Sequence, residues 1–356
     1  MAQILWFRRD LRITDNAILA NAKNKVLPIF IFDKNILDNL EKDDKRVTFI
    51  YKSVLELKEK LKTIGLDLAI FYGKPNKIFK RLKEKGFNEV LCSIDFDSYA
   101  KKRDLEVEKI IPIRRFIDSF ILDPKEHLKK DNTAYKVFTP FYKSLDFITN
   151  SKNIQIYKID RKLTKIEFEY SSFPTLKKMG FEKQKLPVFL QKDPYLLLAE
   201  FKNKIENYAI DRDFFYKDST SNISVHLRFG LISPKEIFNY FKMQNNIDST
   251  SYIRELFFRE FYNYILFHFP YSEDSNFNTL SIQWNENEDD FQKWCNGKIG
   301  IPIIDAAMIH LNNTGLMHNR LRMVVASFLC KNLFIDWRKG ENILLQNFLI
   351  MKQVQI

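Results

Sequence analysis

Roughly the first 130 residues alternate short apolar runs with helix-like patterns, and this alternation constrains the fold more than any other feature. The apolar runs lie at 3–7, 27–32, 66–72 and 89–94. The helix-like patterns lie at 15–22, 47–63, 75–85 and 99–110. Strands that alternate with helices build parallel sheets, because each return to the same edge needs a long crossover. We therefore expect a doubly wound parallel sheet, of the Rossmann-like α/β class, with helices on both faces.

The sequence divides into three parts by composition. The first part has the α/β pattern. No GxGxxG fingerprint follows its first apolar run and the chain has no Walker loop, so this pattern alone predicts no nucleotide site. A polar stretch with prolines and lysine runs follows, and then helical periodicity continues almost throughout. We expect an α/β domain over 1–128, an interdomain linker over 129–194 and an all-α helical domain over 195–356.

The composition is that of a globular protein. The 356 residues are 45% hydrophobic and 15% aromatic, with only 9 glycines, and the longest apolar runs are much shorter than the roughly 20 residues of a membrane span. Three separated cysteines, Cys92, Cys295 and Cys330, give neither a disulfide framework nor zinc spacing, and the histidines form no ligand pair. We expect a soluble, cytoplasmic monomer with no metal and no membrane contact.

The net charge of +12 is the first hint of a partner. Neutralising phosphates releases counterions, so a basic protein suits a polyanion such as DNA. A codon bias toward lysine explains the charge equally well.

The segment 315–341 carries more functional information than any other. Its apolar residues recur every three or four positions: Leu321, Val325, Phe328 and Leu329. Asn319, Arg322 and Met323 fall on another part of the same expected helix. An ordinary exposed polar face would account for these three residues, but the amino-acid sequence of the segment as a whole does not favour that explanation.

MHNRLRM, followed by SFL and DWRKGE, closely resembles the flavin domain of the DNA photolyase and cryptochrome family. The resemblance is strongest to the class I enzymes that repair cyclobutane pyrimidine dimers. Long matches in the same order support it: ILWFRRDLRITDNAIL (4–19), DSFILDPKEHLKKDNTAYKVFTPF (118–141), YIRELFFREFYNYI (252–265) and KIGIPIIDAAMIHLNNTGLMHNR (298–320). Such a series is far more specific than one short motif. It implies an FAD-binding helical domain.

The run STSNIS at 219–224 places small hydroxyls before a helical pattern that ends near Gly230. A helix amino terminus with free amides suits a phosphate, although ordinary capping by Ser or Thr is an alternative. The resemblance assigns the flavin diphosphate to Thr220, Ser221 and Ser224, with Tyr208 nearby.

Glu255 and Arg259 lie one turn apart on a helix with little surface suited to water. They could form a simple ion pair. The resemblance instead implies that Glu255 hydrogen-bonds the damaged pyrimidines and contacts FAD, and that Arg259 sits between flavin and DNA. Phe258 occupies a position where many dimer photolyases have a tryptophan that stacks on the lesion. Leu316 stands where another tryptophan is common.

The resemblance also assigns roles to the helix that starts near Asn319. Asn319 and Met323 would approach the lesion, with Asn319 also touching FAD, and Arg320 would contact DNA. Arg322 would face the flavin ring, where a cation favours an anionic reduced flavin. Glu255, Asn319 and Met323 are therefore the expected catalytic residues.

Together these residues predict light-dependent repair of pyrimidine dimers in DNA by electron transfer from reduced FAD to a flipped-out lesion. A cryptochrome-like blue-light sensor shares nearly every flavin contact and is one alternative. An inactive, truncated DNA-binding fragment is another.

The resemblance is incomplete at the electron-transfer chain, at the antenna site and at the carboxyl end. Trp284 and Trp337 match two members of the family's electron-transfer chain, although simple packing also explains an isolated tryptophan. A folate or deazaflavin antenna is possible in the family, but Ala100 stands where a folate-binding carboxylate is expected. Similarity stops after Leu349, with Ile350 and Lys352 in place of expected acidic residues. We therefore expect a helical domain truncated at its carboxyl end.

Overall fold

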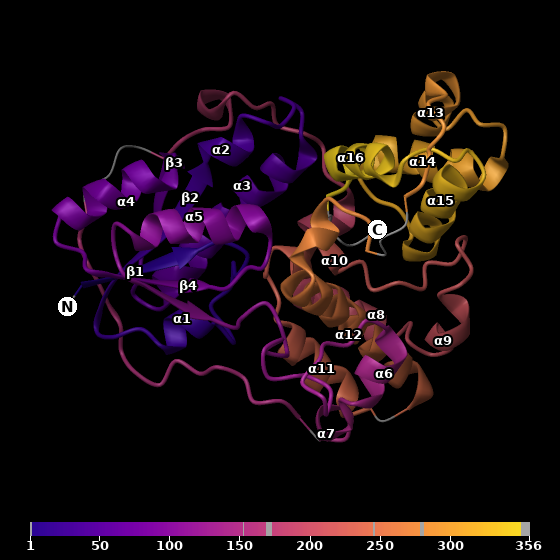
Figure 1. Cartoon of the computed structure of the whole chain (residues 1–356). Coiled ribbons are helices and arrows are strands. Elements are labelled where there is room, and N and C mark those ends of the chain that lie inside the picture. The colour runs from indigo at the N-terminus through magenta and orange to yellow at the C-terminus, as the bar shows by residue number, and fades with distance from the viewer. Residues whose placement is uncertain (1, 152, 169–172, 245, 278–280, 350–356) are drawn as a thin grey trace.

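The computed structural model describes residues 2–151, 153–168, 173–244, 246–277 and 281–349. A sheet domain at the amino end lies beside a helical domain that contains the carboxyl half (Figure 1). This arrangement confirms the expected fold class. None of the described helices is both long enough and apolar enough to cross a bilayer.

The sheet is parallel and runs in the order β3-β2-β1-β4-β5. Its strands are β1 (Ala2–Phe7), β2 (Lys25–Asp33), β3 (Ala69–Gly73), β4 (Glu89–Ser93) and β5 (Ile113–Phe116). In the register of the central strands, Trp6 lies opposite Ile29 on one side and Cys92 on the other. The first four strands were predicted. The fifth, IRRF, was missed because two arginines interrupt its apolar pattern.

Helices cover both faces of the sheet, as predicted. They are α1 (Ala17–Ala20), α2 (Lys34–Leu37), α3 (Lys45–Thr63), α4 (Pro75–Glu84) and α5 (Ser98–Glu108). Successive residues of a strand point to opposite faces, so Leu5 and Phe7 join the core with α3 while Ile4 and Trp6 join the core with α4. A doubly buried strand must be apolar on both faces, which explains the continuous run at 3–7.

The expected linker contributes to both domains. Its short strand β6 (Thr164–Lys165) extends the sheet by pairing with β2. Its helix α6 (Phe138–Lys143) buries Phe138 and Phe141 in the core of the helical domain. The remaining elements are α7 (Asp146–Thr149) and the 3₁₀ turns η1 (Lys177–Met179) and η2 (Val188–Gln191).

The carboxyl half is helical, as expected. Its elements are α8 (Pro194–Lys202), α9 (Tyr208–Asp211), α10 (Ser224–Arg228), α11 (Pro234–Lys242), α12 (Ile247–His268), η3 (Pro270–Glu273), α13 (Glu288–Cys295), α14 (Pro302–Thr314), α15 (Asn319–Lys331) and α16 (Trp337–Asn347). Capping residues in the sequence determine where several of these helices begin or end. Ser233 and Glu236 form a capping box at α11, and Asn246 and Ser249 form one at α12. Helix α14 ends at Thr314, and Gly315 caps it in the left-handed conformation.

The two domains meet closely at Gly230, just after α10. Its φ is +68°, and a Cβ at this position would lie 2.0 Å from the carbonyl oxygen of Arg9. The Leu11 amide donates to the Phe229 carbonyl at 3.3 Å, and buried Arg12 donates to the Gly230 carbonyl at 3.3 Å. The residues that hold α10 are therefore fixed against the sheet domain.

Candidate functional site

Most of the predicted site residues lie on α9, α10, α12 and α15 and on the chain segments between α9 and α10. The phenol of Tyr252 donates to the Ser221 hydroxyl at 2.9 Å, and the rings of Tyr208 and Tyr252 meet edge to face at 5.4 Å. Burial, followed by the charge of Glu255, raises the pKa of Tyr208 to about 12. Tyr208 therefore remains a neutral phenol near Ser221 at ordinary pH.

Helix α10 begins at Ser224 in a form that suits an anion. Its N-cap is Ile223, and in the described part of the chain no side chain caps its first amides. Thr220 donates to the Asn222 side chain at 3.3 Å instead of capping the helix. Ser224 is exposed. Amides at a helix start beside hydroxyl groups are the kind of donors that bind an anion.

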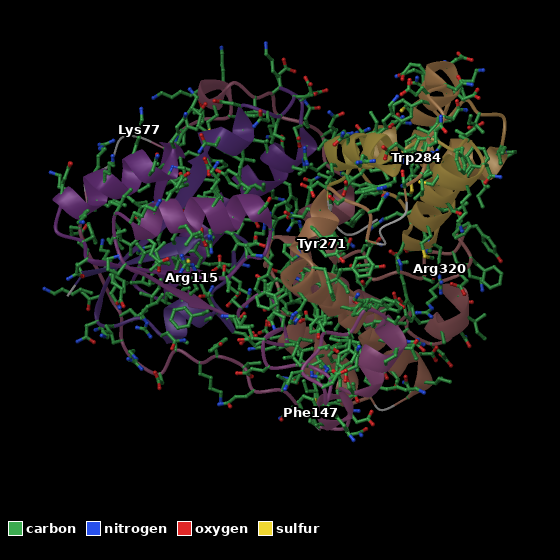
Figure 2. The ribbon with its side chains drawn as sticks, in the orientation of Figure 1. Lys77, Arg115, Phe147, Tyr271, Trp284 and Arg320 are labelled. Carbon is green, nitrogen blue, oxygen red and sulfur yellow. The ribbon has the colours of Figure 1, made fainter. Side chains whose placement is uncertain are left out.

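The segment 212–218, which we call the bridging loop, links α12 to α15. Arg212 pairs with Glu255 of α12 at 2.6 Å, and Asp213 pairs with Arg320 of α15 at 2.8 Å. Figure 2 shows Arg320 where α15 approaches the chain after α9. Two consecutive residues of this loop therefore contact two different helices.

The sequence analysis missed the bridging loop. The signal was present in the run DRDFF, which puts both charges directly after the helix of Tyr208. Phe215 adds a third contact, because its ring meets the His318 ring at 5.1 Å.

Helix α15 places Asn319 and Met323 on an exposed face. Both residues are exposed, with Met323 at 52%, and they lie one turn apart. The opposite stripe is buried, with Val325 at 0% and Leu329 at 1%. Of the predicted apolar stripe, Val325 and Leu329 are buried, whereas Leu321 and Phe328 are only partly buried against the same core.

Arg322 lies on the inner side of this surface. Its guanidinium donates to the Met317 carbonyl at 3.2 and 3.3 Å and lies 4.9 Å from the centre of the Phe348 ring. Burial lowers its pKa to about 10, so Arg322 is still a cation at neutral pH. Its hydrogen bonds go to a neutral carbonyl oxygen, so they do not neutralise its positive charge.

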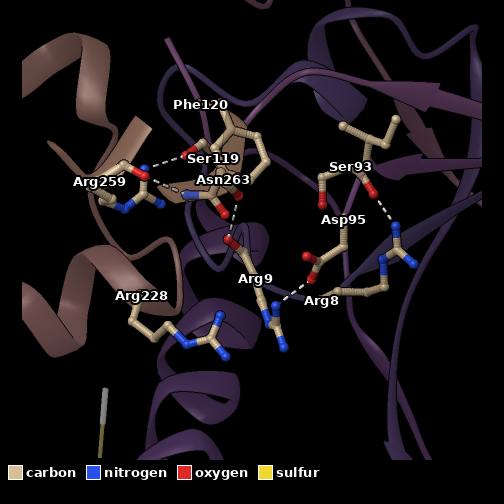
Figure 3. A pocket seen from close by; sticks show the side chains of 10 residues that line it. Arg8, Arg9, Ser93, Asp95, Ser119, Phe120, Arg228, Arg259 and Asn263 are labelled. Atoms are coloured by element: carbon tan, nitrogen blue, oxygen red, sulfur yellow. Dashed lines mark hydrogen bonds and ion pairs between the residues drawn. The ribbon is translucent and has the colours of Figure 1, made fainter. Parts of the chain in front are cut away.

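Arg259, which the resemblance places between flavin and DNA, lies at the boundary between the two domains. Its guanidinium points toward the sheet domain, where it donates to the Ser119 carbonyl at 2.8 Å and pairs with Glu260 at 3.2 Å (Figure 3). It also lies 5.5 Å from the centre of the Phe120 ring. A buried guanidinium needs such partners, and Ser119 and Glu260 supply them.

Arg259 lines a small arginine-rich pocket at this boundary, together with Arg8, Arg9 and Arg228 (Figure 3). Arg9 forms an ion pair with Asp95. The volume of about 20 Å³ has room for about one water molecule and none for a cofactor. This pocket is therefore too small for FAD, and the hydrogen bond from Arg259 to Ser119 joins the two domains beside it.

Phe258, expected at the position of a lesion-stacking ring, contacts the chain itself. Its ring stacks on Phe138 with centroids 3.5 Å apart and planes 13° apart, and Arg254 lies 5.9 Å from its centre. One face of Phe258 is therefore covered by the chain itself. Leu316 is half-buried and packs against the main core.

The two expected electron-transfer tryptophans lie in different surroundings. Trp284 contacts Phe334 at 5.6 Å between ring centroids. Trp337 donates its indole N–H to the Asn276 side chain at 2.7 Å. Trp294, which the sequence analysis did not single out, is fully buried and donates to the Val325 carbonyl at 3.2 Å.

Two further expectations concern the antenna position and the carboxyl end. Ala100 is buried in α5 and its amide donates to Asp97 at 2.7 Å, so that position offers no carboxylate to a folate. Ile350 and Lys352, which stand in place of the expected acidic residues, lie outside the described residues.

Comparisons with known proteins identify the family of the chain. The family described as the FAD binding domain of DNA photolyase matches residues 252–352, and the family described as DNA photolyase matches residues 3–154. The deoxyribodipyrimidine photo-lyase of Alkalihalophilus pseudofirmus is 31% identical over 95% of this chain and 74% of its own length. That of a Synechococcus species is 31% identical over 97% of this chain and 77% of its own length.

Solved structures show the same similarity. A class III photolyase from Agrobacterium tumefaciens has a TM-score of 0.82 at 28% identity, covering 99% of this chain and 77% of that one. An archaeal photolyase from Sulfolobus tokodaii, solved with two FAD molecules, has a TM-score of 0.82 at 27% identity, covering 100% of this chain and 81% of that one. The chain therefore belongs to the DNA photolyase family, whose helical domain binds FAD.

Proposed function

We propose that this protein is a deoxyribodipyrimidine photo-lyase that uses light and FAD to repair cyclobutane pyrimidine dimers in DNA. Relatives of that name, at 31% identity over nearly the whole chain, support the reaction. The observation that carries the proposal is the bridging loop. Its Arg212 pairs with Glu255 of α12 and its Asp213 pairs with Arg320 of α15, and these two helices carry the residues that we assign to the lesion.

The cofactor residues divide into two groups. Thr220, Ser221 and the first amides of α10 hold the diphosphate, because they offer hydroxyl and N–H donors at a helix start. Arg322 supplies a positive charge on the side of the ring and favours its anionic reduced form. When bound, reduced FAD supplies the light-excited electron that opens the cyclobutane ring.

The lesion residues orient the damaged bases. Glu255 accepts hydrogen bonds from pyrimidine N–H groups, and Arg212 fixes its direction through the 2.6 Å pair. Asn319 offers both donors and an acceptor to base edges, while Met323 contributes a flexible apolar contact. A dimer pairs and stacks poorly, so moving it out of the helix costs less than moving intact bases. The charge of +12 favours capture of the backbone.

The proposal is tested by illuminating the purified full chain, supplied with reduced FAD, in the presence of an oligonucleotide that contains one thymine dimer. We expect loss of the dimer in blue light and none in the dark. Flavin binding without light-dependent repair would favour the blue-light sensor. Neither flavin binding nor repair, with DNA binding retained, would favour the inactive fragment.

A further inference from the structure

Helix α4 of the sheet domain carries exposed positive charge that the proposed repair does not use. Its exposed side chains include four cations, Lys77, Lys80, Arg81 and Lys83, which we call the α4 basic face. The helix has one carboxylate, Glu84, which is also exposed. In the described part of the chain, none of the four cations forms an ion pair or lies over an aromatic ring. Their charge is therefore open to a partner.

A general bias toward lysine does not account for this face. On α3, the other long helix of the sheet domain, Lys60 lies 3.7 Å from Asp193 and Lys62 lies 2.7 Å from Glu59. A bias that acts on composition alone would not leave the cations of α4 unpaired while those of α3 have carboxylate partners. The concentration of unpaired charge is specific to α4.

The order of charges along α4 disfavours the helix itself. Lys77 stands in the first turn, which holds no acidic residue, although the helix dipole favours negative charge there. Lys80 and Arg81 follow Lys77 at the spacings of three and four residues that bring like charges together. Natural sequences keep such local conflicts mainly at functional sites. The arrangement thus favours binding over helix stability.

The partner contacts α4 through charge alone. A helix that lies on a membrane surface inserts its apolar face between the lipids. The apolar face of α4 is not free to do so, because Ile78, Phe79 and Leu82 are buried in the core of the sheet domain. A polyanion in solution therefore fits the face better than a lipid surface does.

The α4 basic face is remote from the residues assigned to the lesion. Helix α4 lies on the side of the sheet domain away from the helical domain, which contains α12 and α15 (Figure 1). Lys77 lies at the outer surface of the sheet domain (Figure 2). A partner of α4 is therefore different from the DNA segment that contains the lesion.

We propose that the α4 basic face binds the phosphate backbone of a second DNA duplex, so that one protein molecule holds two duplexes. The ten residues of α4 span about 15 Å, and a duplex carries one charge per about 1.7 Å of its axis. A stretch of DNA as long as α4 thus offers about nine phosphates to four cations. The contact is independent of base sequence, because phosphates carry no sequence information.

The choice of DNA among polyanions rests on the proposed function. The test of the second contact uses undamaged DNA in the dark, so it needs neither flavin nor repair. Loss of repair with a second duplex still bound would refute the proposed function alone.

The α4 variant replaces three cations of the face with a good helix former, in the combination Lys77→Gln, Lys80→Gln and Arg81→Gln. The control variant removes the same net charge from lysines that form ion pairs elsewhere: Lys60→Gln, Lys62→Gln and Lys192→Gln. Circular dichroism checks that both variants are folded.

Native mass spectrometry of the full chain with an undamaged duplex of about one helical turn counts the duplexes bound at low salt. We expect two per chain for the parent and the control, and one for the α4 variant. Fluorescence anisotropy should show that the second binding event weakens about 40- to 150-fold between about 50 and 200 mM salt, as for three or four phosphate contacts.

Three results would overturn the proposal. One is a single duplex per parent chain at low salt. The second is a second duplex that the α4 variant binds as tightly as the control does. The third is pelleting with phosphatidylserine vesicles that requires the α4 basic face, without a second duplex, which would assign the face to a membrane surface.

Discussion

Glu255 is the residue whose chemistry matters most for the proposed repair, and it forms an ion pair with Arg212. Glu255→Ala removes the acceptor for the damaged bases and should lower repair about 10- to 100-fold, as expected for one hydrogen bond to a charged group. FAD content should change much less. Repair rate and flavin absorbance, measured on the same preparation, give both values.

The matched control is Glu286→Ala, which removes an exposed carboxylate outside the site. It should leave the repair rate unchanged. Equal repair by Glu255→Ala and the parent would refute the assignment of Glu255.

Gly230 offers a second test with an internal control. Gly230→Ala should lower the free energy of unfolding by about 2–4 kcal/mol, because the new Cβ meets the Arg9 carbonyl and φ is positive. Gly86 also has a positive φ, +89°, but a Cβ added there would meet no atom within 4 Å, so Gly86→Ala should cost only about 1–2 kcal/mol. Urea unfolding measures both, and a larger loss for Gly86→Ala would contradict the close approach.

At the scale of elements, the bridging loop should be held mainly by its inner ion pair. The side chains of Arg212 and Glu255 are 20% and 28% exposed, whereas those of Arg320 and Asp213 are 39% and 54% exposed. Exposed pairs contribute about 0–1 kcal/mol, so the outer pair should show the smaller coupling energy. Two double-mutant cycles, one for each ion pair, measure the coupling energies by urea unfolding. A larger coupling energy for the outer pair would contradict this prediction.

Elements were predictable where their pattern is local. The strands at 3–7 and 27–32 and the stripe of α15 follow from spacing within one segment. The bridging loop does not, because Arg212 and Glu255 are 43 residues apart and no local rule joins them. The orientation of Arg259 depends on a carbonyl 140 residues away.

At the scale of the whole molecule, the domain boundary should make stability depend on pH. Asp10 is fully buried, and burial followed by the charge of Asp118 raises its pKa to about 7. The unfolded value is about 3.9. Between these values the native state binds more protons than the unfolded state, so this group destabilises the fold as pH rises from about 4 to about 7.

Asp10→Asn remains neutral throughout and keeps an oxygen for the Arg8 amide, which donates to Asp10 at 2.7 Å. Relative to the parent, the variant should therefore gain stability between pH 5 and pH 8. Urea midpoints at both values measure the change. Asp43→Asn, at an exposed position, is the control, and a difference that moves the other way would contradict the burial of Asp10.

The central claim is that the helical domain holds FAD between the start of α10 and the inner side of α15. Titration of the full chain with FAD, followed by flavin fluorescence, tests it most directly. We expect saturable, equimolar binding that Arg322→Ala weakens and Glu286→Ala does not. Colourless protein that takes up no added FAD would contradict the account.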